Sequence, residues 1–149
     1  MAVQRGGWNK VLWLEGIPQG PVVKISAGGY VLGALTQGGD LYVWGQRGGS
    51  RAFIEDISDE PKPIDLDADV KDFALGYQHI ILVTTDGHIF VRGSNKSGQL
   101  GLGKEVEWKD GWTNVNIPLK DGEVVAGVDA GNKTSFILTK RSGHGDGGS

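Results

Sequence analysis

The stretch VKDFALGYQHIILVTTDGHIFVRG, residues 70–93, decides the fold because the chain repeats it. The segment VVKISAGGYVLGALTQGGDLYVWG, residues 22–45, aligns with it without a gap, and VAGVDAGNKTSFILT, residues 125–139, aligns with its first part. The alignment places three glycines at one position: Gly28, Gly76 and Gly131. Self-similarity of this kind indicates a repeat architecture in which each copy is one structural unit.

Each full copy has the composition of a short β-hairpin. In the second copy, the β-branched, aliphatic and aromatic runs at 80–84 and 89–91 flank the dipeptide Asp86-Gly87, which is a hairpin signal. Gly38-Gly39 stands at the same place in the first copy. Because both dipeptides tolerate positive φ, we predict type I′ turns at these two positions.

The hairpin runs are apolar on successive residues rather than on alternate ones, which predicts sheets that are covered on both faces. The blades of a β-propeller are covered in this way by their two neighbours. We therefore predict an all-β chain that forms a partial, open β-propeller of about two full blades plus partial blades. An open arc leaves apolar faces and strand edges at its ends, so we expect either a fragment of a longer protein or ring completion by another chain or copy.

The repeats also set the domain boundaries. We assign an N-terminal partial blade, two repeats, a partial third repeat and a disordered tail to residues 1–21, 22–69, 70–124, 125–140 and 141–149. Trp8 and Trp13 are expected in strands of the N-terminal partial blade. Residues 104–121 form a predicted spacer loop that lengthens the second repeat. The tail has no apolar run that could pack as a strand.

Composition and charge exclude several classes of function. The formal charge is −3, from 15 Lys and Arg against 18 Asp and Glu, with no block of five or six like charges, which disfavours direct nucleic-acid binding. The chain has no cysteine and therefore no disulfide. It has neither the apolar core of a signal peptide nor an apolar segment of membrane-spanning length. We expect a cytoplasmic or nuclear protein that has no membrane contact.

The second copy continues from its hairpin into GSNKSGQLGLG, residues 93–103. This succession resembles the repeat of the regulator-of-chromosome-condensation family, in which an Ala-Gly-x-x-His segment, a Leu-Thr-x-Asp-Gly turn and a Gly-x-Asn-x-x-Gly-Gln-Leu-Gly loop follow one another. The resemblance covers residues 22 to 140 and implies seven-bladed rings. Members include guanine-nucleotide exchange factors for a Ran-type GTPase, ubiquitin-ligase adaptors, partners of tRNA- and diphthamide-modification proteins and bacterial inhibitor proteins. The resemblance therefore implies the fold more firmly than the activity.

The repeats of this chain depart from the family pattern at several positions. Leu75 stands where the family usually has Ala, and Arg92 stands where it usually has Trp. The first copy carries QRGGSR at 46–51 instead of the Gly-Gln-Leu-Gly loop. Only the second copy has the repeat histidine, His79, for which we expect a structural hydrogen bond.

Three ligand-like patterns fail on chemical grounds. GQLGLGK at 98–104 resembles a phosphate-binding loop, but Glu105 follows where Ser or Thr is needed to hold magnesium. DLDAD at 65–69 resembles the start of a calcium loop, but the glycine and the final glutamate of that loop are missing. No histidine pair has the spacing of a zinc helix; the three histidines are His79, His88 and His144. We predict no metal site and no cofactor.

The spacer is the first candidate partner surface. We find no nucleophile motif, no acid–base pair and no cofactor fingerprint, so we predict no catalytic residue and no enzymatic activity. Aromatic residues in a polar loop are good interface anchors, and the spacer contains Trp108, Lys109, Asp110 and Trp112. The alternative is that one or both tryptophans fold back as a blade strand or cover. Residues 55–60 are interpreted as an exposed acidic linker.

A second candidate surface comprises residues at equivalent places in successive copies: Tyr30, Tyr77, Gln78, Asn132 and Lys133. Equal positions in a repeat emerge on the same face. We predict a module that binds a protein partner, such as a small GTPase or a subunit of a modification complex, through loops on one propeller face. One alternative is nucleotide exchange on a Ran-type GTPase. The other is a structural arc that completes a propeller by self-association or with another chain.

Overall fold

The computed structural model describes residues 20–47 and 52–142. Within these ranges the chain forms ten β-strands and no helix, in two four-stranded sheets of order β1-β2-β3-β4 and β5-β6-β7-β8 and a two-stranded sheet β10-β9. The strands are β1 Val22–Gly28, β2 Val31–Thr36, β3 Leu41–Gly45, β4 Lys62–Pro63, β5 Val70–Leu75, β6 His79–Thr84, β7 Ile89–Ser94, β8 Trp108–Val115, β9 Glu123–Gly131 and β10 Thr134–Arg141. All pairings are antiparallel.

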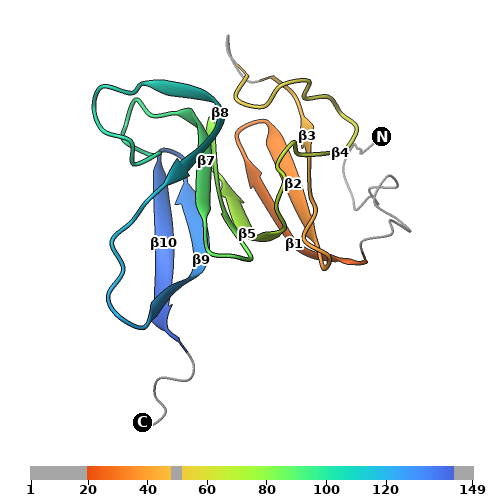
Figure 1. Cartoon of the computed structure of the whole chain (residues 1–149). Helices are drawn as coiled ribbons and strands as arrows, with labels where there is room; N and C mark the ends of the chain where they lie inside the picture. The colour runs from red at the N-terminus through yellow and green to blue at the C-terminus, as the bar shows by residue number, and fades with distance from the viewer. Residues whose placement is uncertain (1–19, 48–51, 143–149) are drawn as a thin grey trace.

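The three sheets stand side by side in chain order, with the β5–β8 sheet between the other two (Figure 1). The first strands of the sheets contact one another in succession, β1 with β5 and β5 with β9. This arrangement confirms the predicted all-β fold, an open arc of two full blades and a partial one. The predicted N-terminal partial blade with Trp8 and Trp13 lies, apart from its last two residues, outside the described residues, as does the tail after Ser142.

Both hairpins close through a turn other than the predicted type I′. Gly39 N donates to Thr36 O at 3.1 Å, and Gly87 N donates to Thr84 O at 3.0 Å. Gly39 and Gly87 have φ of 95° and 91°, whereas the residue before each glycine keeps a negative φ. A type I′ turn needs positive φ at both central residues. The observed pattern is that of a three-residue hairpin loop, in which the glycine alone takes the left-handed conformation.

The apolar side chains gather in two clusters, one between each pair of neighbouring sheets. The first cluster joins Leu35 of the first sheet to Phe73 of the second, and the second joins Val83 of the second sheet to Val128 of the third. All six residues of β6 are buried. The middle sheet is therefore covered on both faces, which explains why its sequence is apolar on successive residues.

The predicted spacer loop at 104–121 contains a strand. Residues 108–115 form β8, which pairs with β7 and completes the second sheet. The alternative in which the tryptophans fold back into a blade is therefore the one that the structure supports. At the other boundary, β10 extends to Arg141 because its pairing with Glu123 continues the ladder one residue into the predicted tail.

The predicted acidic linker is exposed, but the residues beside it are not. Glu55, Asp56, Asp59 and Glu60 are all exposed, as expected. Phe53 and Ile54 are buried in the cluster between the first two sheets. The segment after β3 therefore contributes to the core of the arc in addition to connecting β3 with β4.

Candidate protein-interaction surface

The turns at one end of the three sheets bring Tyr30, Tyr77 and Asn132 together. The Tyr30 and Tyr77 side chains are exposed, and their ring centroids lie 6.5 Å apart at an interplanar angle of 55°. Tyr77 N donates a 2.9 Å hydrogen bond to Asn132 O in the next sheet. The three turns thus form one continuous row, which we call the turn surface. It comprises the predicted residues Tyr30, Tyr77, Gln78, Asn132 and Lys133.

The turn surface can be continuous because the backbones below it approach closely. A Cβ at Gly28 would lie 2.2 Å from Gly76 O, and a Cβ at Gly76 would lie 2.8 Å from Gly131 O. Both distances are shorter than any real Cβ contact. The glycines that define the repeat are therefore required where one blade meets the next, and they set the spacing of the turns.

His79 holds the second and third sheets together directly beneath the turns. Its ring is fully buried, and Nε2 lies 3.1 Å from Thr134 O and 3.0 Å from Ser135 Oγ. Nδ1 is buried and has no hydrogen-bond partner within the described ranges. Burial lowers the pKa of His79, opposed by the hydrogen bond to the Thr134 carbonyl. The ring is thus a neutral donor, which confirms the structural hydrogen bond expected at this position.

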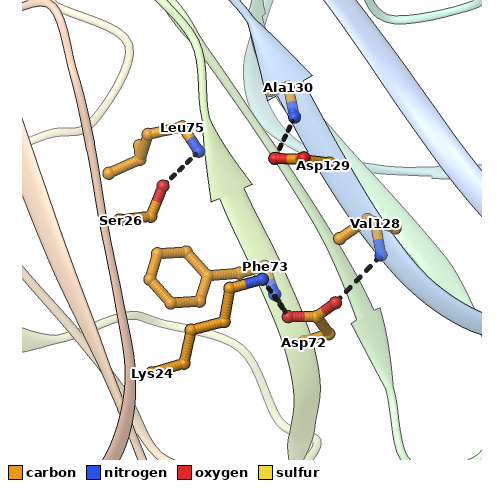
Figure 2. A network of polar contacts seen from close by, with 8 residues as sticks. All are labelled: Lys24, Ser26, Asp72, Phe73, Leu75, Val128, Asp129 and Ala130. Carbon is orange, nitrogen blue, oxygen red and sulfur yellow. Dashed lines mark hydrogen bonds and ion pairs between the residues drawn. The ribbon is translucent and has the colours of Figure 1, made fainter.

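Asp72 connects all three sheets at the level of their first strands (Figure 2). Its Oδ1 lies 2.5 Å from Lys24 Nζ on β1, and its Oδ2 accepts a 3.0 Å hydrogen bond from Val128 N on β9. Phe73 N donates to Oδ1 at 2.9 Å. A Cβ at Gly127 would lie 2.7 Å from Oδ2, so the glycine leaves room for the carboxylate. Together with the close glycine approaches, this node fixes the relative position of the blades that carry the turn surface.

The predicted spacer residues lie on β8, the outermost strand of the middle sheet. Trp108 and Trp112 are partly buried and pack against the cluster between the first and second sheets. Trp108 Nε1 donates to Asp110 Oδ1 at 2.7 Å. Lys109 pairs with Gly93 of β7. Because both rings cover the core, much of their area is already used within the chain, and they are not free anchors.

Arg92 is half-buried against β8, a placement that was not predicted from the sequence. Its guanidinium lies 5.4 Å from the centre of the Trp112 ring and donates through Nη2 to Asp110 O. Burial lowers the pKa of Arg92, while the charges of Glu55, Asp110 and Asp65 oppose that shift. The group borders a crevice of about 430 Å³ between the outer strands of the first two sheets. A cation beside an aromatic face in a partly desolvated site is a stabilising arrangement.

The turn surface and Lys109 of the predicted spacer surface lie at the same end of the middle sheet, two strands apart. His79 on β6 pairs with Gly93 on β7, which in turn pairs with Lys109 on β8. Lys109 therefore lies two strands outward from His79, or roughly 10 Å at the usual strand spacing. The structure joins Tyr30, Tyr77 and Asn132 into one row and places the β8 residues farther out on the same end.

The glycine-rich loop after β7 is held by its own side chains. Asn95 Nδ2 donates to Gly103 O at 3.0 Å and to Val106 O at 2.7 Å, while its Oδ1 accepts from Leu100 N at 2.8 Å. Asn95 and Gln99 are buried, and Leu100 belongs to the core. The loop amide of Leu100 is thus already bonded internally, which supports the structural interpretation of this loop.

The described residues contain no cluster of three or more potential metal-ligating side chains. His88 Nδ1 lies 3.0 Å from Asp86 Oδ1 at an exposed hairpin turn, and His144 is outside the described ranges. None of the elements described is a helix that could span a bilayer.

Comparison with known proteins agrees with this architecture. The sequence profile of the regulator of chromosome condensation repeat matches residues 70–99. The mouse (Mus musculus) regulator of chromosome condensation is 34% identical over 88 residues, covering 56% of this chain and 21% of the relative. An RCC1 repeat-containing protein of Dictyostelium discoideum is 32% identical over 142 residues, covering 89% of this chain and 28% of the relative. Prp20p from Saccharomyces cerevisiae superposes with a TM-score of 0.70 at 19% identity, covering 86% of this chain and 33% of that chain.

Residues 70–99 form a repeat of the regulator of chromosome condensation family, and the chain as a whole is similar to proteins built from this repeat. It spans between about a fifth and 28% of the length of these curated relatives. Human WBSCR16 has the same fold, with a TM-score of 0.61 at 22% identity over 83% of this chain and 32% of that chain.

Two contacts between strands and sheets were not predicted from the sequence. Arg92, which replaces the usual Trp, is stacked on Trp112; the departure was visible in the sequence, but its partner was not. Asp72 is aligned with Lys24 and Gly127 in the other copies. That change of residue type at one repeat position was the available signal for a contact between blades.

Proposed function

We propose that this chain is a non-enzymatic interaction unit of a β-propeller that binds a protein partner through the turn surface. The observation that carries the proposal is the exposed row of Tyr30, Tyr77 and Asn132, contributed by three successive blades. Tyrosine side chains in such a row offer a large amphipathic contact area at low cost in conformational entropy. Lys133 adds a positive charge at one end.

Rigidity supports this assignment. The turns are tied to each other by the Tyr77–Asn132 bond, and the blades beneath them are tied by the His79–Thr134 bond. A surface that is already ordered loses little entropy when a partner binds. The turn surface is therefore well suited to recognition.

The relatives indicate the kind of partner. Yeast Prp20p is described with its binding to Gsp1p and histones, and in a further structure Kap60 is bound to it. We propose a protein partner for this chain as well, such as a small GTPase or a subunit of a modification complex, in the nucleus or cytoplasm. Neither a nucleic acid nor a membrane enters the proposal.

Affinity capture tests the proposal. The chain is immobilised and incubated first with a purified Ran-type GTPase and then with a cell lysate, and retained proteins are quantified by mass spectrometry. We expect the double variant Tyr30→Ser/Tyr77→Ser to retain specific partners at least about tenfold less than the wild type, because interface energy concentrates in buried aromatic anchors. Leu119→Ser, which removes an exposed apolar side chain outside the turn surface, serves as the matched control.

Two outcomes would overturn the assignment. Equal retention by the double variant and the wild type would show that partners bind elsewhere. Accelerated nucleotide release from the GTPase at catalytic concentrations of the chain would replace simple binding with exchange activity. Both measurements use the same protein preparations, so folding of each variant is checked once by circular dichroism.

A further inference from the structure

Each end of the arc exposes large apolar side chains on a sheet face. On the first sheet, Ile25 is 74% exposed and Leu32 is 43% exposed. On the third sheet, Phe136 is 56% exposed and Leu138 is 52% exposed. We call these pairs the leading face, Ile25 and Leu32, and the trailing face, Phe136 and Leu138. Exposed pairs of this kind commonly mark interaction sites.

The repeat shows what normally covers the leading face. Ile25 and Leu32 align with Phe73 and Ile80 of the second copy. Both of those residues are fully buried in the cluster that the first and second sheets share. A Cβ at Gly33 would lie 2.5 Å from the Phe73 ring, so that ring faces β2 of the preceding sheet. The leading face therefore has the composition of a surface that receives a preceding blade.

The trailing face is the opposite half of the same junction. Phe136 and Leu138 align with Ile81 and Val83 of the second copy. These two residues are buried in the cluster between the second and third sheets, together with Val128. Because Val128 aligns with Ile25, a junction built on the trailing face would place Phe136 and Leu138 against a residue in the position of Ile25.

Between the first and second sheets, a backbone amide of one sheet donates to a side chain of the preceding sheet. The leading and trailing ends of the arc carry the groups that correspond to this donor and this acceptor. Leu75 N donates to Ser26 Oγ in the preceding sheet at 3.2 Å (Figure 2). Ser26 aligns with Asp129 at the trailing end, and Leu75 aligns with Ala27 at the leading end. Asp129 Oδ1 accepts from Ala130 N at 2.9 Å. By the same alignment, the other carboxylate oxygen of Asp129 is the acceptor that corresponds to Ser26 Oγ, and the Ala27 amide of another copy is the corresponding donor.

We propose that a second copy of this chain binds head to tail, with the trailing face of one copy covering the leading face of the next. Each molecule carries both halves of the junction that the fold already builds twice within the chain. Such a contact joins two different surfaces, and heterologous contacts of this type generate rings or open chains of copies. This inference uses the end faces and is independent of the turn surface, so either can fail without the other.

Sedimentation velocity on the full chain tests the inference through two end-blocked variants. Ile25→Lys blocks the leading face and Phe136→Lys blocks the trailing face, and both change side chains that are already exposed, so folding is preserved. A lysine placed in an apolar junction without a partner is strongly unfavourable. We expect the wild type to associate with increasing concentration and each variant alone to associate at least about tenfold more weakly. Leu119→Lys, outside both end faces, is expected to behave as the wild type.

The mixture of the two variants gives the decisive result. Ile25→Lys keeps an intact trailing face and Phe136→Lys keeps an intact leading face, so an equimolar mixture is expected to form a heterodimer that grows no further. A wild-type chain that remains monomeric at all concentrations would overturn the inference. Self-association of either single variant at wild-type strength would also overturn it, since that result indicates a face pairing with itself.

Discussion

Replacing Asp72 with Ala should weaken the arc more than any other single change at its polar contacts. The carboxylate accepts from Val128 N at 3.0 Å and from Phe73 N at 2.9 Å and lies 2.5 Å from Lys24 Nζ. Asp72→Ala removes all of these contacts without adding bulk. Val128 is 2% exposed, so water cannot readily replace the lost acceptor of its amide.

The magnitude follows from the separate contributions. Leaving the buried Val128 amide without an acceptor costs about 1–3 kcal/mol. The ion pair with Lys24, whose side chain is 35% exposed, adds less than about 1 kcal/mol because solvent screens it. We therefore expect Asp72→Ala to lower the free energy of unfolding by about 1–4 kcal/mol. Lys24→Met removes the ion pair and the contact of the ammonium with the Phe73 ring but leaves both amides their acceptor, so it should lower the free energy of unfolding by only about 1 kcal/mol or less.

Equilibrium unfolding in urea, followed by tryptophan fluorescence, measures both variants. With a slope of about 2 kcal/mol per molar urea, a loss of about 3 kcal/mol moves the midpoint by about 1.5 M. All proteins are compared at one low concentration, because self-association would raise the apparent stability. A midpoint for Asp72→Ala within about 0.3 M of the wild type would refute the reasoning. An equal loss in Lys24→Met would show that the ion pair, rather than the buried amide, determines the effect.

Three further predictions concern other contacts. Burial lowers the pKa of His79 below its unfolded value of 6.5, so the unfolded chain binds the proton more readily, and the free energy of unfolding should keep its full value above pH 6.5 and fall as the pH decreases below it. Urea midpoints measured at a series of pH values should fall less steeply in His79→Gln than in the wild type. Gly76→Ala places a Cβ 2.0 Å from His79 Cε1 and should lower the free energy of unfolding, measured with heat or urea, by about 1–3 kcal/mol. The control Gly111→Ala, with no atom within 4 Å of its Cβ, should leave the unfolding midpoint nearly unchanged. Similar losses in both variants would contradict the close-approach argument. Arg92→Lys loses the planar stacking on Trp112, so it should shift the tryptophan emission and lower the free energy of unfolding by about 1 kcal/mol. An unchanged emission spectrum and an unchanged urea midpoint would indicate that the stacking contributes nothing.

Local sequence patterns predicted the blades because each blade is built from contacts that are close along the chain. The hairpins at Gly39 and Gly87 were located correctly, but the turn type was wrong. Asp-Gly and Gly-Gly suit several turns, and the pairing of Thr84 with His88 across the loop selects among them. The sequence left open whether the segment of β8 forms a loop or a blade strand, because WKDGWTNV contains Gly, Asp and Asn, which have low β propensity. Its pairing with β7 overrides that preference.

The residues of the candidate site also divide into those that the sequence placed and those whose role it left undecided. Equal and adjacent repeat positions predicted that Tyr30, Tyr77 and Asn132 emerge together, because the repeat converts sequence position into a shared direction. The roles of Trp108 and Trp112 could not be decided from the sequence, since an aromatic residue in a polar segment is compatible with an anchor and with a core cover. Packing of both rings against the cluster between the first and second sheets favours the cover.

The sequence alone thus determined the repeat, the hairpins and the order of the blades, because these depend on periodicity and on residues within a few positions of each other. Only the tertiary structure decided which side chains join one blade to the next. Asp72 meets Lys24 and Val128, and Arg92 meets Trp112, across separations along the chain that no local pattern encodes. These contacts arise when whole sheets pack side by side, since the packing brings together residues that are far apart in the sequence.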